Sequence, residues 1–130
     1  EPYVFSNNHK PRIIKRWVVK SGGQSDIGMW TEMGYNCDIQ GPPLTRRRKN
    51  LVAIYESEFI AESPTSNQDY IDSFGGPGTD KRYERIISYL TNQINGKRNL
   101  KRMSKAVSKW KSDLQWFRKY VGFRHNQVIE

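Results

Sequence analysis

Apolar positions in the C-terminal half of the chain recur at intervals of three and four residues, the period of an amphipathic helix. Thr79 is a suitable N-cap and Asp80 a favourable acid for a first turn, so one helix is predicted from there to Gly96. A second helix is predicted from Asn99 or Ser104 to Gly122. The two stripes consist of Tyr83, Ile86, Ile87, Leu90 and Ile94, and of Met103, Val107, Trp110, Leu114, Phe117 and Val121.

The N-terminal half contains shorter apolar runs, rich in β-branched residues and separated by turn residues. These runs predict strands over 12–20, 35–40 and 51–60. The last contains five consecutive apolar residues, which fits a central strand better than a helix, although that segment alone is compatible with either. Segment 26–33 is predicted to be a short helix or a strand pair, and 67–74 a short helix.

The order of these elements predicts an α+β fold in which a small N-terminal mixed or antiparallel β-sheet packs against a C-terminal helical hairpin. A sheet of three to five strands is expected in a sheet-rich half over 1–74. The Gly-Gly-Pro-Gly segment 75–78 is the strongest break in the chain and is predicted to be a hinge. The hairpin then covers 79–122 and a tail covers 123–130. A chain of 130 residues is expected to form a single domain.

Composition narrows the class of protein. Aromatic residues make up 12 % of the chain, too many for a disordered basic tail. The longest apolar run has five residues, which excludes a transmembrane helix or signal peptide in this sequence and predicts no membrane partner. The single Cys37 weakly favours a reducing, intracellular location, cytoplasmic or nuclear. Because the chain starts at Glu1 without Met, we expect a fragment or processed product of a larger protein.

The net charge of +9 is unevenly distributed. Residues 1–49 carry a net +5, residues 50–79 a net −5 with no basic residue, and residues 80–130 a net +9. Two basic blocks around an acidic middle indicate an oriented molecule with one strongly positive side, which favours anionic partners.

One face of the final predicted helix, opposite its apolar stripe, combines lysines with an aromatic residue. Trp116 is out of phase with the core positions and lies among these lysines. An indole there can stack on a base while ammonium groups neutralise phosphates, or it can pack against the N-terminal sheet or a partner chain. Both interpretations remain open from the sequence. The face contains Lys101, Lys105, Lys109, Ser112, Trp116 and Lys119.

A second basic feature is the run at 46–49, which directly precedes the most apolar segment. It is interpreted as a phosphate clamp, with a nuclear import signal or a solvated turn as alternatives. If the hairpin acted as a helix-turn-helix, Asn99, Arg102 and Lys105 would face the bases. The predicted nucleic-acid-binding residues are Arg46, Arg47, Arg48, Lys49, Arg98, Lys101, Arg102, Lys105, Lys109, Trp116 and Lys119.

Catalytic chemistry is less well supported. Glu56 and Glu58 would point to the same side of a strand, and Asp38 could complete a divalent-metal site of a nuclease. However, no lysine lies near Glu56 where the usual nuclease pattern requires one. His9 and His125 are expected to be ordinary surface residues. No catalytic residue, metal ligand or cofactor is therefore assigned.

The function predicted from the sequence is non-catalytic nucleic-acid binding, with DNA favoured over RNA. The first alternative is an assembly module of a viral or mobile-element protein, in which the acidic middle of one chain meets a basic block of the next. That alternative implies a homo-oligomer or a larger parent protein. A metal-dependent nuclease is the second alternative.

Overall fold

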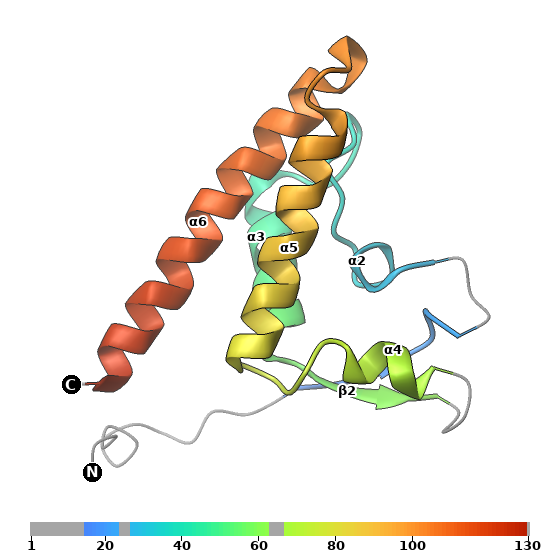
Figure 1. The fold of residues 1–130 in the computed structure, drawn as a ribbon, viewed down its shortest axis with the longest axis vertical. Coiled ribbons are helices and arrows are strands. Elements are labelled where there is room, and N and C mark those ends of the chain that lie inside the picture. Colours follow the sequence, from blue (N-terminus) through green and yellow to red (C-terminus); the bar gives the residue numbers. More distant parts are fainter. Residues whose placement is uncertain (1–14, 24–26, 63–66, 130) are drawn as a thin grey trace.

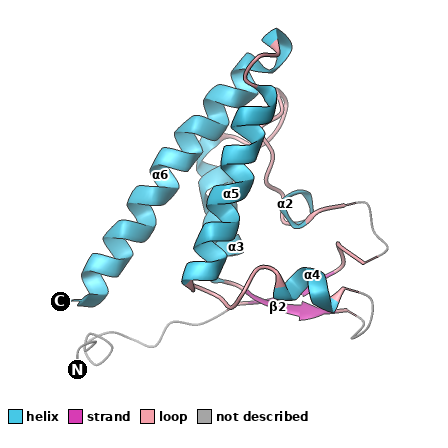
Figure 2. Cartoon of the chain, in the orientation of Figure 1, coloured by secondary structure: helices cyan, strands magenta, loops and turns pink. Residues whose placement is uncertain are grey.

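The structure is a computed structural model that describes residues 15–23, 27–62 and 67–129 (Figure 1). Long helices dominate it (Figure 2). They are α3 (Leu44–Glu56), α5 (Asp80–Lys97) and α6 (Ser104–Ile129). The shorter elements are strands β1 (Arg16–Val19) and β2 (Glu58–Ala61), helices α2 (Met29–Glu32) and α4 (Gln68–Asp72), and the 3-10 turn η2 (Lys101–Met103).

The described sheet differs from the predicted one. β1 and β2 pair in parallel, with Arg16 opposite Glu58 and Val19 opposite Ala61, and they are the two strands of the described residues. The prediction of a mixed or antiparallel sheet is therefore wrong, while the α+β class is confirmed. Parallel strands need a long crossover connection, and α2 and α3 supply it here. The predicted strand over 35–40 forms no regular element.

The strand predicted over 51–60 is also wrong for most of its length, because α3 covers it as far as Glu56. The helix begins after Pro43, so the basic run forms its first turns and the apolar residues its later ones. Leu51, Ile54 and Tyr55 are buried, which is the three-and-four spacing of a helix face. The chain becomes extended at Ser57, and β2 (Glu58–Ala61) follows, so the prediction holds only for the end of the segment.

The helical C-terminal half follows its apolar spacing. Thr79 caps α5 as predicted, because its Oγ1 accepts a hydrogen bond from the Arg82 backbone N–H at 3.2 Å. α6 begins at Ser104 and continues past the predicted end at Gly122 to Ile129, so residues 123–129 are helical rather than a tail. α5 and α6 pack along each other, and α3 contacts both (Figure 1). Buried positions of the two stripes are Ile86, Leu90, Ile94, Val107, Trp110, Phe117 and Val121.

Arg82 joins the helical half to the rest of the fold. It is 1 % exposed, and its guanidinium donates hydrogen bonds to main-chain carbonyls at the end of α3 and in the turn after α4. The predicted hinge at 75–78 is bound to the same place, since the Gly78 N–H donates to the Tyr55 carbonyl at 2.8 Å. None of the described helices is both long and apolar enough to cross a membrane.

Candidate nucleic-acid interface

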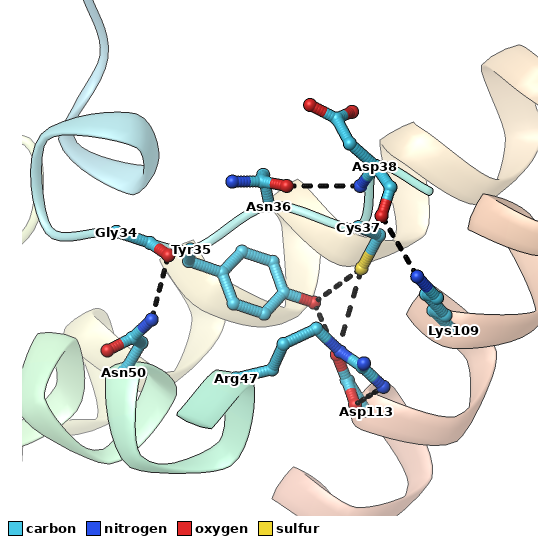
Figure 3. Close-up of polar contacts among 9 residues, drawn as sticks. All are labelled: Gly34, Tyr35, Asn36, Cys37, Asp38, Arg47, Asn50, Lys109 and Asp113. Atoms are coloured by element: carbon cyan, nitrogen blue, oxygen red, sulfur yellow. Dashed lines mark hydrogen bonds and ion pairs between the residues drawn. The ribbon is translucent and has the colours of Figure 1, made fainter. Parts of the chain in front are cut away.

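Arg47, one of the predicted phosphate-binding residues, is instead part of the interior. It is 5 % exposed, and its Nε and Nη2 atoms donate to the two carboxylate oxygens of Asp113 at 2.8 and 3.1 Å (Figure 3). The interaction joins the first turns of α3 to the middle of α6. A guanidinium held in this way is not available to a phosphate, so Arg47 is removed from the candidate interface.

The Asp113 carboxylate has two further neighbours on the segment before α3. Tyr35 donates its hydroxyl to Asp113 Oδ2 at 2.8 Å, and the Cys37 thiol lies 3.5 Å from the Tyr35 hydroxyl oxygen (Figure 3). Burial, with the nearby Cys37 and Asp113, raises the pKa of Tyr35 far above its usual range. Burial also raises the pKa of Cys37 to about 11. Both groups are therefore protonated at neutral pH and add no charge to the buried ion pair.

Burial of Asp113 changes the electrostatics of the outer surface. Between residues 97 and 123 the sequence has nine basic residues and a single acidic one, Asp113. That acid is fully buried and neutralised by Arg47. All exposed formal charge on this stretch is therefore positive. Its basic residues are Lys97, Arg98, Lys101, Arg102, Lys105, Lys109, Lys111, Arg118 and Lys119.

Most of the other predicted binding residues are solvent-accessible. Lys109 is half-buried, and its Nζ donates to the main-chain carbonyl of Asp38 at 2.9 Å (Figure 3). Asn99, considered as a base-facing residue, is exposed beside the turn into α6. The exposed members of the predicted set are Arg46, Lys49, Arg98, Lys101, Arg102, Lys105 and Lys119.

The two basic blocks meet where α3 packs against α6. The guanidinium carbon of Arg48 lies 5.2 Å from the centroid of the Trp116 ring. Trp116 is half-buried and packs against the core, so packing accounts for part of its out-of-phase position. The neighbour it packs against is α3, whose apolar second half was predicted to be a strand.

Trp116 also lines a groove of about 700 Å³ between α3 and α6. The Tyr120 ring stacks on Trp116, with ring centroids 5.3 Å apart and planes 18° apart. The Tyr120 hydroxyl donates to Glu56 Oε2 at 2.7 Å. Lys49 and Lys15 also line the groove, and both are exposed. The groove thus combines two aromatic rings, three cationic side chains and one carboxylate with an apolar wall formed by Leu44, Val52 and Ala53.

Sequence reasoning missed two of these residues. Tyr120 lies four residues after Trp116, and residues at that spacing share a helix face, so the helical period contained the signal. Lys15 had no comparable signal, because its place in the groove depends on the pairing of β1 with β2.

The nuclease alternative assumed that Glu56 and Glu58 lie on one strand and point to the same side, and the structure contradicts this assumption. Glu56 is the last residue of α3 and Glu58 the first residue of β2, so they do not alternate along one strand. No group of three metal-ligating side chains occurs among the described residues. His9 and the side chain of His125 lie outside the part of the chain that the structure describes.

No protein-family model matches this chain, and neither a curated protein nor a solved structure resembles it significantly.

Proposed function

We propose that this chain binds nucleic acid without catalysing a reaction, through the basic residues of α6, the turn before it and the first turns of α3. DNA is favoured over RNA. The observation that carries the proposal is the burial of Asp113, which leaves the exposed part of residues 97–123 with positive charge only. Side chains of one sign along a helix attract a polyanion and release its counterions on binding.

The salt dependence of binding tests this proposal. Fluorescence anisotropy of a labelled DNA duplex, a DNA single strand and an RNA single strand is measured over a series of salt concentrations. If six to eight phosphates are neutralised, log affinity falls against log salt with a slope of roughly −5 to −7 on duplex DNA. A slope near zero on all three probes contradicts the proposal. Size-exclusion chromatography of the free chain tests the competing assembly function, which expects a salt-sensitive oligomer.

A matched pair of double variants tests the location of the surface. Lys105→Glu with Lys119→Glu removes two exposed lysines of α6. Lys20→Glu with Lys81→Glu makes the same change of charge at exposed lysines outside that helix. The first variant is expected to weaken binding and to lower the magnitude of the salt slope by about two, whereas the second leaves the slope unchanged. Equal losses in the two variants would show that only the net charge matters.

A further inference from the structure

We propose that the groove between α3 and α6 binds an unpaired nucleobase, so that this chain prefers single-stranded nucleic acid to duplex. This inference rests on the proposed function and assigns it a substrate class. The groove volume of about 700 Å³ is within the usual range for pockets that hold small organic ligands, roughly 300–1,000 Å³. A base with its sugar is a ligand of that class.

The flat groups in the groove match the faces of a base. Bases stack on aromatic rings and on guanidinium planes, and the groove contains both. Trp116 and Tyr120 form a stacked pair, and the Arg48 guanidinium lies over the Trp116 ring, so a base would stack on Trp116 in place of Arg48 or on the outer face of the guanidinium. All three side chains line the same groove.

Arg48 has a further property that favours a ligand. Its Nε–H is buried and has no acceptor among the described residues. An unpaired buried donor is unfavourable, because it has lost its hydrogen bonds to water and gained none in the protein. A phosphate oxygen or a base oxygen in the groove can accept a hydrogen bond from this donor if the Arg48 side chain moves toward it. Ligand binding would therefore pair a donor that is unpaired in the free protein.

The charges in the groove orient the nucleotide. Glu56, whose Oε2 accepts a hydrogen bond from the Tyr120 hydroxyl, brings a carboxylate to the groove, and carboxylate oxygens can accept hydrogen bonds from the amino group of a base in addition to those they already have. Lys15 and Lys49 are exposed lysines that line the same groove and attract phosphate. The base edge is therefore expected to point toward Glu56 and the phosphates toward these two lysines. An apolar peptide side chain would fill the groove without using any of these charges.

A paired base cannot use this arrangement. In a duplex both faces of a base are covered by its neighbours and its amino edge is paired, so only an unstacked base can enter a concave groove. The exposed lysines of α6 place no such restriction, because they contact backbone phosphates of either form. Backbone binding and base binding are thus separable in one molecule.

The test compares Trp116→Leu with the unaltered chain on two labelled DNA probes of equal phosphate count. One is a mixed-sequence single strand of about ten nucleotides, within the site sizes of single-strand binders. The other is a blunt hairpin duplex closed by a nucleotide-free glycol linker, so that it contains no unpaired base. We expect Trp116→Leu to weaken single-strand binding by roughly 5- to 150-fold, the range for removal of one stacking side chain. Duplex affinity and the salt slope are expected to stay unchanged. Trp116→Phe, which keeps a ring, recovers most of the loss.

The outcomes separate this inference from the proposed function. If neither probe binds, the proposed function fails. If both probes bind with a steep salt slope and Trp116→Leu affects neither, or both equally, nucleic-acid binding stands and the base-binding groove is wrong. If the single strand binds no more tightly than the hairpin, the stated preference is wrong.

A second measurement uses the unaltered chain, so it does not depend on whether a variant folds. A single strand that carries 5-iodouracil is irradiated in the complex, and the cross-linked peptide is identified by mass spectrometry. Cross-links at Trp116 or Tyr120 support the groove, because the reaction requires close contact between the base and an aromatic ring. Cross-links found only outside α3 and α6 overturn the assignment.

Discussion

The guanidinium of Arg47 and the carboxylate of Asp113 form a two-point ion pair in the interior, with N–O distances of 2.8 and 3.1 Å. The pair joins α3 to α6, which are the two sides of the groove that Trp116 lines, and so it fixes the distance between these helices. Burial alone would lower the pKa of Arg47, but the hydrogen bonds and charge of Asp113 outweigh it and raise that pKa. In a buried pair of this kind, loss of one charge leaves the other buried without a counterion, which is strongly destabilising.

Asp113→Asn is therefore expected to lower the free energy of unfolding by about 3–5 kcal/mol, because it leaves Arg47 charged and buried without a counterion. Urea unfolding followed by circular dichroism measures the change. The triple variant Arg47→Met with Asp113→Leu, combined with Tyr35→Phe, removes both charges and the hydroxyl that donates to Asp113, and should recover most of the loss. Glu84→Gln, at an exposed acid of α5, is the control and should change stability by no more than about 0.5 kcal/mol. A loss below about 1 kcal/mol for Asp113→Asn contradicts this account of the pair.

Arg82 is a buried cation whose partners are main-chain carbonyls rather than a carboxylate. Its shortest contacts are to the carbonyls of Ile54 at 2.6 Å and of Ser57 and Gly75 at 2.8 Å. Burial lowers the pKa of Arg82 to about 10, which still leaves the side chain charged at neutral pH. One side chain thereby pairs the Ile54 carbonyl at the end of α3 and the Ser57 carbonyl directly after it.

Arg82→Lys keeps the charge but lacks the planar fork that reaches these carbonyls at once. We expect it to lower the free energy of unfolding by about 3 kcal/mol or more, since several buried acceptors lose their donor. Thermal and urea unfolding measure the effect. Arg98→Lys, at an exposed position after α5, is the matched control and should be nearly neutral. If the two substitutions change the free energy of unfolding equally, the hydrogen bonds of Arg82 do not stabilise the end of α3 and the turn after α4.

Glu32 ties the end of β1 to α2 and predicts a dependence of stability on pH. Its carboxylate accepts hydrogen bonds from the Trp17 indole at 2.6 Å and from the backbone N–H of Ser21 at 2.6 Å and of Lys20 at 3.0 Å. Burial alone would raise the pKa of Glu32, but these hydrogen bonds outweigh it and hold that pKa below its usual value of 4.5.

A carboxylate with a lowered pKa in the folded state stabilises the protein above its unfolded pKa, and this contribution is lost as the pH falls through the folded value. Glu32→Gln is thus expected to lower the free energy of unfolding by about 1–2 kcal/mol at neutral pH, where the Glu32 carboxylate is ionised. This difference from the unaltered chain should shrink as the pH falls below about 4.5. Urea unfolding from neutral to acid pH measures this difference, with the exposed Glu62→Gln as control. A difference that stays constant with pH would rule out the ionised form as its source.

The parts of the fold that were predictable are those in which one residue period dominates. In α5 and α6 most apolar residues recur on one face, with Trp116 an exception on α6, so their spacing identified both helices. The start of α3 was not identified, because four basic residues and then five consecutive apolar ones obscure the period. Once α3 is recognised as a helix, Arg47 shares the face of Leu51 and Ile54, and Asp113 falls between Trp110 and Phe117 on the core stripe.

The residues of the candidate site also divide into those that a helical period reveals and those that only the tertiary structure brings together. The lysines of α6 were identified from the sequence because they lie opposite a clear apolar stripe. The groove was not, because it requires α3 beside α6 and the parallel pairing of two strands about forty residues apart, as Arg16 and Glu58 are. Neither relationship leaves a local pattern in the chain.

The last prediction concerns Arg48, whose planar group lies over Trp116. Arg48→Lys keeps the positive charge and the contact with phosphate but removes the plane that stacks on a ring or a base. On the groove proposal, single-strand affinity should fall several-fold while duplex affinity and the salt slope stay the same. Arg46→Lys, an equal change at an exposed position of the same helix, is the control. Anisotropy on the two DNA probes measures both variants. A uniform loss on both probes would instead show that Arg48 acts only as a charge.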